Sequence, residues 1–273
     1  MGIYFILAPF TTGDFIAASP PENISQGNIS QGDILPENIL IVSIDSLHPR
    51  ALGPESSPHI YSLMKKGVYS LKGQSTDPPL TLISHTAMFS GRSPLENGKT
   101  DNGWIPGHPT LQGNTLFHEP KRAGFVTGFF YSKEKLEFLV NQAIDVHGLS
   151  RDFTVDRAAD FFQLSGKHFC FLHISGLDRA GPAEGWLSLG YQEELYYIDA
   201  ALKPLITMIQ GKKKYLIIIT SDHAGHDRTH GSDHPEDSQL PLVMISDIYD
   251  LTAYQDSPYQ VTQLNSILYR LME

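Results

Sequence analysis

The stretch Asn38-Ile-Leu-Ile-Val-Ser-Ile-Asp45 decides the fold of this 273-residue chain. A continuous apolar run that ends in an acid is typical of a strand buried on both faces of a sheet. A second such run, Tyr215-Leu-Ile-Ile-Ile-Thr220, leads directly into Ser221-Asp222-His223. Three further ranges predict buried strands by the same criterion: 125–131, 168–175 and 240–245. The sequence therefore predicts several neighbouring strands without a solvent-exposed face.

Stretches with helical spacing of apolar residues separate these strands. The range 57–66 has Pro58 in its first turn and Gly67 after its end, which are typical helix start and stop signals. Helices are also predicted over 154–164, 191–209 and 260–272. Because strands alternate with helices, we expect an α/β fold with a mostly parallel central sheet and helices on both faces. No break in composition divides residues 38–273, so we expect a single domain without a large cap domain.

Residues 1–37 are expected to form a flexible leader. The pentapeptide Asn-Ile-Ser-Gln-Gly occurs at 23–27 and again at 28–32, and such low complexity is typical of a tether. The apolar segment Ile3–Pro9 is either a poor export signal, since no basic residue precedes it, or an extended arm. An exported location and a cytoplasmic one therefore both stay open.

Composition excludes several classes of function. The chain has 20 basic and 30 acidic residues, a net charge of −10, and its one basic run is Lys212-Lys213-Lys214. Binding of a nucleic-acid backbone is not expected from such a chain. No stretch approaches the ~18–20 apolar residues that span a bilayer, so no transmembrane segment is expected. The single cysteine, Cys170, excludes an internal disulfide and a cysteine-based metal site.

Acidic residues follow three of the predicted strands. Asp45 and Asp222-His223 end two of them, and Asp178 lies three residues beyond Ser175. Each acid taken alone is explained as a cap or a turn residue. However, ligands of open α/β sheets bind beyond the carboxyl ends of the strands, where these residues converge. Carboxylate and imidazole ligands suit zinc, manganese or a similar divalent ion, and the loop to Gly231 adds His226 and His230.

The segment from Thr76 to Gly91 contains a candidate nucleophile. Pro78 and Pro79 favour an extended approach, and the following residues are predicted to be helical, which puts Thr81 at or near a helix N-terminus. Backbone N–H groups there favour an anion. A threonine hydroxyl is too weak an acid to attack unaided, but a divalent ion beside it would make it a nucleophile. The alternative is an ordinary N-cap, and this segment taken alone favours the cap.

Five elements in order carry a family resemblance. They are Asp45 in Ile-Asp-Ser-Leu, Thr81 followed at +4 by His85, Asp178-x-x-Gly181, Ser-Asp222-His223, and His230-Gly231. From residue 38 to the C-terminus, the chain resembles the alkaline phosphatase superfamily, and most closely its type I phosphodiesterase/nucleotide pyrophosphatase branch. The resemblance implies an α/β hydrolase of phosphoesters that acts on a small phosphorylated substrate through a covalent phospho-threonine.

The resemblance also implies two divalent metal ions, zinc or another such as manganese. By position, one ion would be held by Asp45, Asp222 and His223 and would activate Thr81, itself a ligand. The other would be held by Asp178 and His230. His85 would support the nucleophile turn, and Asn102 would face the substrate.

Two departures from the family pattern stand out. The family reads Asp-x-x-x-His, and this chain has Pro182 where that histidine belongs. The second site then keeps two protein ligands, fewer than the three that a catalytic zinc normally has. Three outcomes are open: a substitute ligand from His226 or His173, a weakly held second ion, or lost activity. Ser84 stands where nucleotide pyrophosphatases usually have asparagine, and its hydroxyl is expected to contact substrate.

Two alternative functions follow from these departures. One is a catalytically impaired member of the fold that binds a metal or a phosphorylated ligand, an interpretation that rests on Pro182. The other is a sulfatase-like hydrolase, for which Cys170 lacks the Cys/Ser-x-Pro-x-Arg context.

Overall fold

The computed structural model describes residues 35–273. The predicted leader falls on residues 1–37, so nearly all of it lies outside the described residues. Of the part that is described, Glu37 is held at the start of the sheet, because its backbone N–H donates to the carbonyl of Lys214 (2.7 Å).

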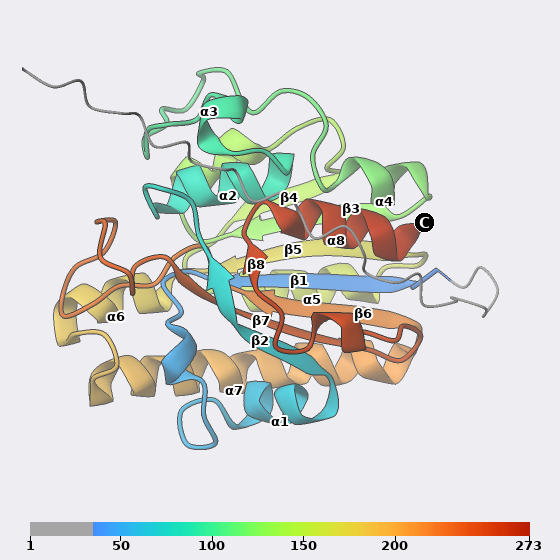
Figure 1. The fold of residues 1–273 in the computed structure, drawn as a ribbon. Coiled ribbons are helices and arrows are strands. Elements are labelled where there is room, and N and C mark those ends of the chain that lie inside the picture. Colours follow the sequence, from blue (N-terminus) through green and yellow to red (C-terminus); the bar gives the residue numbers. More distant parts are fainter. Residues whose placement is uncertain (1–34) are drawn as a thin grey trace, which may run out of the picture. The chain divides into compact units, whose positions relative to one another are not determined.

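The centre of the described chain is one sheet in the order β4-β3-β5-β1-β6-β7-β2-β8 (Figure 1). Strands β4, β3, β5, β1 and β6 are parallel, whereas β7 runs antiparallel to both β6 and β2. The short β8 pairs in parallel with β2. The strands are β1 (Asn38–Ile44), β2 (Val68–Gln74), β3 (Val126–Tyr131), β4 (Val146–Leu149), β5 (His168–Ile174), β6 (Tyr215–Thr220), β7 (Gln239–Ser246) and β8 (Tyr259–Gln260). The predicted α/β class with a mostly parallel sheet is confirmed.

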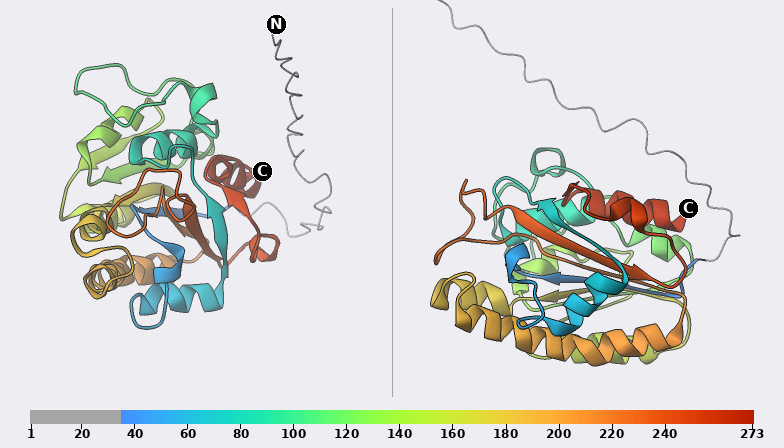
Figure 2. Two further views of the ribbon diagram at one scale, coloured as in Figure 1. Left: turned by 60° about the vertical axis from the view of Figure 1, so that its left-hand side comes forward. Right: turned by 60° about the horizontal axis from the view of Figure 1, so that its bottom comes forward.

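Helices cover both faces of the sheet, as Figure 2 shows from two further directions. The α-helices are α1 (Pro58–Lys66), α2 (Thr81–Ser90), α3 (Pro94–Asn97), α4 (His118–Arg122), α5 (Thr154–Gln163), α6 (Gly176–Glu184), α7 (Leu189–Lys212) and α8 (Gln263–Met272). Three 3₁₀ turns join them, η1 (Pro49–Ala51), η2 (Glu134–Leu139) and η3 (Thr252–Tyr254). Helices α1, α5 and α7 lie on one face, and α2, α4 and α8 lie on the other.

The position of strand β1 explains why the deciding stretch is mostly apolar. Ile39 and Ile41 pack into the core shared with α2 and α8, whereas Leu40 and Val42 pack into the core shared with α1 and α7. Successive side chains of a strand point to opposite faces, so a strand covered on both sides favours apolar residues at every position. The polar Ser43 is tolerated because its hydroxyl lies 2.9 Å from His85 Nε2. All seven residues of β1 are buried.

The central position of β1 also fixes where a site can form. Its neighbours are β5 and β6, with Ile44 opposite Ile174 and Ser43 opposite Thr220. These strands are parallel, so the residues that follow them emerge at the same edge of the sheet. None of the helices in residues 35–273 combines the length and the apolar character needed to cross a bilayer.

Candidate active site

Three strand ends bring the predicted acidic residues together. Asp45 follows β1 directly, Asp222 comes two residues after β6, and Asp178 lies in the first turn of α6, which follows β5. Ser46 holds this arrangement: its hydroxyl donates to Asp178 Oδ1 (3.1 Å) and its backbone N–H donates to Asp222 Oδ1 (3.2 Å). Ser46 has a left-handed φ of 67°, a conformation that costs a non-glycine residue energy and is found preferentially at functional sites.

Asp45, Asp222 and His223 form a first set of possible metal ligands. All three are fully buried, and His223 Nε2 lies 3.4 Å from Asp45 Oδ1 and 3.6 Å from Asp222 Oδ2. Within the described chain, Asp222 Oδ2 is buried without a hydrogen-bond partner. A buried carboxylate oxygen without a partner is costly, and a cation would satisfy it. The donor set therefore fits a divalent ion.

Asp178 and His230, together with His223, form a second set. His230 Nε2 lies 3.4 Å from Asp178 Oδ1, and the rings of His230 and His223 stack with centroids 4.4 Å apart. The side chains of Asp178 and His230 are 18% and 23% exposed, so this set is more open than the first. Pro182, on the following turn of α6, is exposed and offers no donor.

Trp186 links the two segments that carry this second set. Its ring lies 5.7 Å from that of His230, centroid to centroid. A Cβ atom at Gly181 or at Gly225 would come within 2.6 Å or 2.4 Å of the indole ring. Glycine is therefore required at both positions for α6 and the 223–230 loop to close around Trp186.

Thr81 is the first residue of α2, as the sequence predicts. The N-cap is Leu80, not Thr81, so the ordinary N-cap interpretation is wrong. The Thr81 hydroxyl instead faces the predicted ligands, with Oγ1 3.4 Å from His223 Nε2. His85 supports the turn one helical turn later: its Nδ1 donates to the Thr81 carbonyl (2.8 Å) and its Nε2 lies 2.9 Å from Ser43 Oγ. Burial lowers the pKa of His85 to about 4, so the ring is neutral at pH 7.

Lys133 is the site residue that the sequence reasoning missed. Its Nζ lies 2.6 Å from Asp45 Oδ2, 2.6 Å from Asp178 Oδ2 and 3.0 Å from Thr81 Oγ1. Burial opposes its charge, but the carboxylates of Asp45, Asp178 and Asp222 outweigh burial and raise the pKa of Lys133. It stands two residues after β3, at the sheet edge where the acids gather. That placement is the signal that could have identified it.

His173 is a fully buried residue of β5 that contacts Asp45. Its Nε2 lies 3.0 Å from Asp45 Oδ2, and its Nδ1 lies 3.0 Å from the hydroxyl of Ser132. Burial opposes ionisation of Asp45, but the Lys133 ammonium and the hydrogen bond from His173 outweigh burial and hold the pKa of Asp45 well below its usual range. Asp45 is therefore an anion fixed in orientation, as a metal ligand needs to be.

Two further predicted residues, Asn102 and Ser84, make their hydrogen bonds within or beside α2. Asn102 lies beside α2, where its Oδ1 accepts hydrogen bonds from the Leu82 N–H (2.8 Å) and from Lys135 Nζ (3.1 Å). Ser84 is fully buried and shares hydrogen bonds with the hydroxyls of Ser75 and Thr76, which does not support contact with substrate.

The structure does not bring His226 to Asp178 and His230. Its Nδ1 lies 2.7 Å from the buried carboxylate of Asp237, and its ring stacks on His234. The reason is local: the 226–229 bridge folds the loop back, so His226 closes onto the 232–237 segment.

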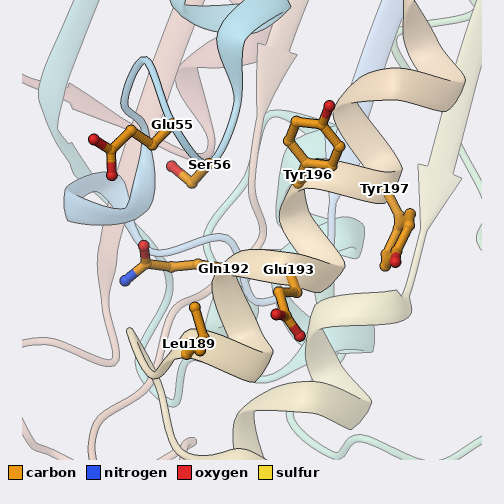
Figure 3. Close-up of a pocket in the computed structure, with 7 residues that line it drawn as sticks. All are labelled: Glu55, Ser56, Leu189, Gln192, Glu193, Tyr196 and Tyr197. Atoms are coloured by element: carbon orange, nitrogen blue, oxygen red, sulfur yellow. The ribbon is translucent and has the colours of Figure 1, made fainter.

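Cavity shape does not identify this site. A hollow of about 220 Å³ lies between the Glu55–Ser56 turn and the first turns of α7 (Figure 3). Its lining includes Gln192, Glu193, Tyr196 and Tyr197, and it contains none of the predicted site residues. The candidate active site is identified by its chemistry: a hydroxyl, three carboxylates, two imidazoles and an ammonium group at one sheet edge.

Residues 39–123 match the model of the family described as type I phosphodiesterase / nucleotide pyrophosphatase. This match includes nearly all of β1 and the whole of α2 with Thr81, and it confirms the family resemblance. GPI ethanolamine phosphate transferase 1 of Gibberella zeae is 27% identical over 157 residues, 51% of this chain and 15% of that enzyme. The human enzyme of that name is 33% identical over 78 residues, 27% of this chain and 8% of the enzyme. The chain thus spans a small part of the curated relatives that it matches.

Solved structures share the fold at low sequence identity. A 2-O GAG sulfatase has a TM-score of 0.71 at 14% identity, over 87% of this chain and 70% of that one. Murine ectonucleotide pyrophosphatase / phosphodiesterase 5 has a TM-score of 0.70 at 13% identity, over 86% and 94%. The C-terminal periplasmic domain of EptC from Escherichia coli, in complex with Zn, has a TM-score of 0.66 at 13% identity, over 87% and 82%. These likenesses establish an alkaline-phosphatase-like fold.

Proposed function

We propose that the chain cleaves or transfers phosphoric ester groups through a covalent phosphothreonine at Thr81. The observation that carries this proposal is the position of the Thr81 hydroxyl, 3.4 Å from His223 and 3.0 Å from Lys133 beside Asp45 and Asp178. A neutral hydroxyl has no structural need for such neighbours. The murine relative supports the proposal, since a threonine-to-alanine variant of it is described as inactive and in complex with AMP.

In the proposed reaction the Thr81 oxygen attacks phosphorus in line with the leaving group. The Thr81 hydroxyl gives its proton to solvent water as the oxygen–phosphorus bond forms, and the bond to the leaving oxygen breaks, so that the leaving group departs as an alcohol after it takes up a proton from water. Thr81 is the first residue of α2, and the positive end of the helix dipole there favours the phosphoryl charge. Water, or another hydroxyl, then displaces Thr81 from phosphorus and restores the enzyme.

Asp45, Asp222 and His223 would hold a divalent ion, zinc or a similar one. When bound, such an ion supplies positive charge that makes a neighbouring hydroxyl more acidic and stabilises charge on phosphoryl oxygens. The protein's own contribution is orientation: His173 fixes Asp45, Ser46 fixes Asp178 and Asp222, and His85 fixes the Thr81 turn.

Transfer to an acceptor other than water is the second form of this function. It is favoured by the matched segments of GPI ethanolamine phosphate transferase 1 in several organisms. Both forms share the first step, so they differ only in which hydroxyl displaces Thr81. The sulfatase alternative gains no support, because residue 81 is threonine and Cys170 is fully buried in β5.

The test compares Thr81→Ala and Thr81→Ser with the unmodified protein on p-nitrophenyl phosphate and bis(p-nitrophenyl) phosphate. We expect Thr81→Ala to abolish turnover and Thr81→Ser to retain part of it. Acid quench followed by peptide mass spectrometry should find the phosphoryl group on the peptide that contains Thr81. Undiminished turnover by Thr81→Ala rejects the nucleophile. An unmodified protein that binds zinc but turns over neither ester supports the impaired member of the fold instead.

A further inference from the structure

Lys133 lies between the two sets of possible metal ligands and contacts both. One of its carboxylate neighbours, Asp45, belongs to the first set, and the other, Asp178, belongs to the second. An ammonium group has three N–H donors, and here three oxygens surround it, those of Asp45, Asp178 and Thr81. The geometry is that of a cation that bridges two carboxylates and touches the nucleophile.

The charge of the site requires such a cation. Asp45, Asp178 and Asp222 bring three carboxylates together, and Asp45 and Asp222 are fully buried. Buried charges persist only when they are paired. One divalent ion in the first set leaves a negative charge near Asp178, and Lys133 neutralises it.

Pro182 explains why a lysine and not a metal ion serves the second set. This position on α6 has no donor, and His223 is already a ligand in the first set, so Asp178 and His230 are the two ligands that the second set has for itself. A catalytic zinc keeps three protein ligands. The ammonium group of a lysine pairs with carboxylates and does not need a third ligand as a zinc ion does. It can therefore serve this set although Pro182 offers no donor.

We propose that Lys133 takes the place of a second metal ion, so that the chain holds one divalent cation, at Asp45, Asp222 and His223. Lys133 neutralises Asp178 and positions the Thr81 hydroxyl. The inference rests on the proposed function only for the role of Thr81; the number of bound ions is independent of turnover.

The experiment counts metal ions in proteins that have been stripped of metal, reloaded with zinc and freed of excess ion. Five proteins are compared: the unmodified chain, Pro182→His, Pro182→His with Lys133→Met, Pro182→His with Lys133→Arg, and Pro182→His with Lys135→Met. Lys135 is the matched control, because it also enters the site but contacts Asn102 and not the carboxylates. Circular dichroism verifies folding, and Lys133→Gln replaces Lys133→Met if that variant does not fold.

We expect one zinc ion per chain in the unmodified protein, in Pro182→His, and in the combinations with Lys133→Arg and Lys135→Met. We expect two zinc ions when Pro182→His is combined with Lys133→Met, because the added histidine and the freed carboxylates complete a second site. Two ions in the unmodified protein or in Pro182→His alone would overturn the proposal, and so would one ion in the Lys133→Met combination. Absence of ester hydrolysis rejects the proposed function but leaves this count readable.

Discussion

The two sets of possible metal ligands lie on different kinds of secondary-structure element. Asp45 and Asp222-His223 follow neighbouring strands at the centre of the sheet and are fully buried. Asp178 lies on a helix and His230 on a loop, and both are partly exposed. Asp178 also forms an ion pair with Lys133. Side chains on rigid central elements keep their geometry, whereas those on loops depend on the packing around them. We therefore expect the geometry of the first set to be rigid and that of the second set to depend on the residues around it.

Removal of a ligand from the first set should have the largest effect. Asp222→Asn keeps the shape but removes a buried charge that we expect to hold the ion, so we expect loss of bound zinc and a fall in kcat/KM of roughly 10³-fold or more. Elemental analysis and p-nitrophenyl ester kinetics measure both. Full zinc content with unaltered kinetics in Asp222→Asn would show that the first set is not the one that holds the ion.

A change in the second set should cost less. His230→Ala removes a partly exposed side chain that lies outside the first set, so we expect zinc to remain bound and kcat/KM to fall roughly tenfold to a hundredfold. His234→Ala is the matched control, since that histidine lies in the same loop region but stacks on His226. A loss of zinc in His230→Ala as complete as in Asp222→Asn would remove the distinction between the sets.

Packing beneath the second set offers a smaller effect on stability. Gly225→Ala places a methyl group against the Trp186 indole, so we expect the free energy of unfolding to fall by about 1–3 kcal/mol, with α6 and the loop shifted. Gly211→Ala is the control, because a Cβ atom there meets nothing. Urea denaturation measures the stability of both variants. A midpoint for Gly225→Ala equal to that of the unmodified protein would show that the loop moves to accept the methyl group without loss of stability.

The last expected effect is absent at neutral pH and appears only in acid. Burial and the nearby Arg50 charge lower the pKa of His48 to about 4, against an ordinary value of 6.5. Between these values the unfolded chain binds a proton that the folded chain does not. The stability contribution is therefore present above pH 6.5 and lost as pH falls toward 4, by about 3 kcal/mol. We expect His48→Gln to flatten this part of the pH profile in urea denaturation, and an unchanged slope would exclude His48 as its cause.

The sequence predicts the strands that have continuous apolar runs but not those that lack such runs. Strands β1, β3, β5, β6 and β7 have continuous apolar runs, and each was predicted to within two residues. Strand β2, whose residues alternate between buried and exposed, and the two edge strands β4 and β8 were missed. Strand β4 has four residues, largely exposed, and β8 has two. Such strands depend on pairing with a neighbour, which a local pattern of apolar residues does not contain.

The site divides in the same way. Asp45, Asp222 and His223 converge because they follow strands that were predicted, and Thr81 begins the helix expected of it. Lys133 was missed because lysine is ordinarily a solvent residue, and its burial becomes visible only once β3 lies beside β5. The partners of Ser84 and His226 could not be predicted for a related reason: side-chain direction depends on neighbours outside the local pattern, here Ser75 and Asp237.

Trp186 gives this chain a built-in optical reporter. The sequence has two tryptophans, and Trp186 is the one that packs on His230, whereas Trp104 lies against the core that contains α2 and α8. With Trp104→Phe, the remaining fluorescence would come from a ring next to the second ligand set. Arrival of an ester in the unmodified protein, or of a second ion in the variant that combines Pro182→His with Lys133→Met, would then be read directly from emission, without a labelled substrate.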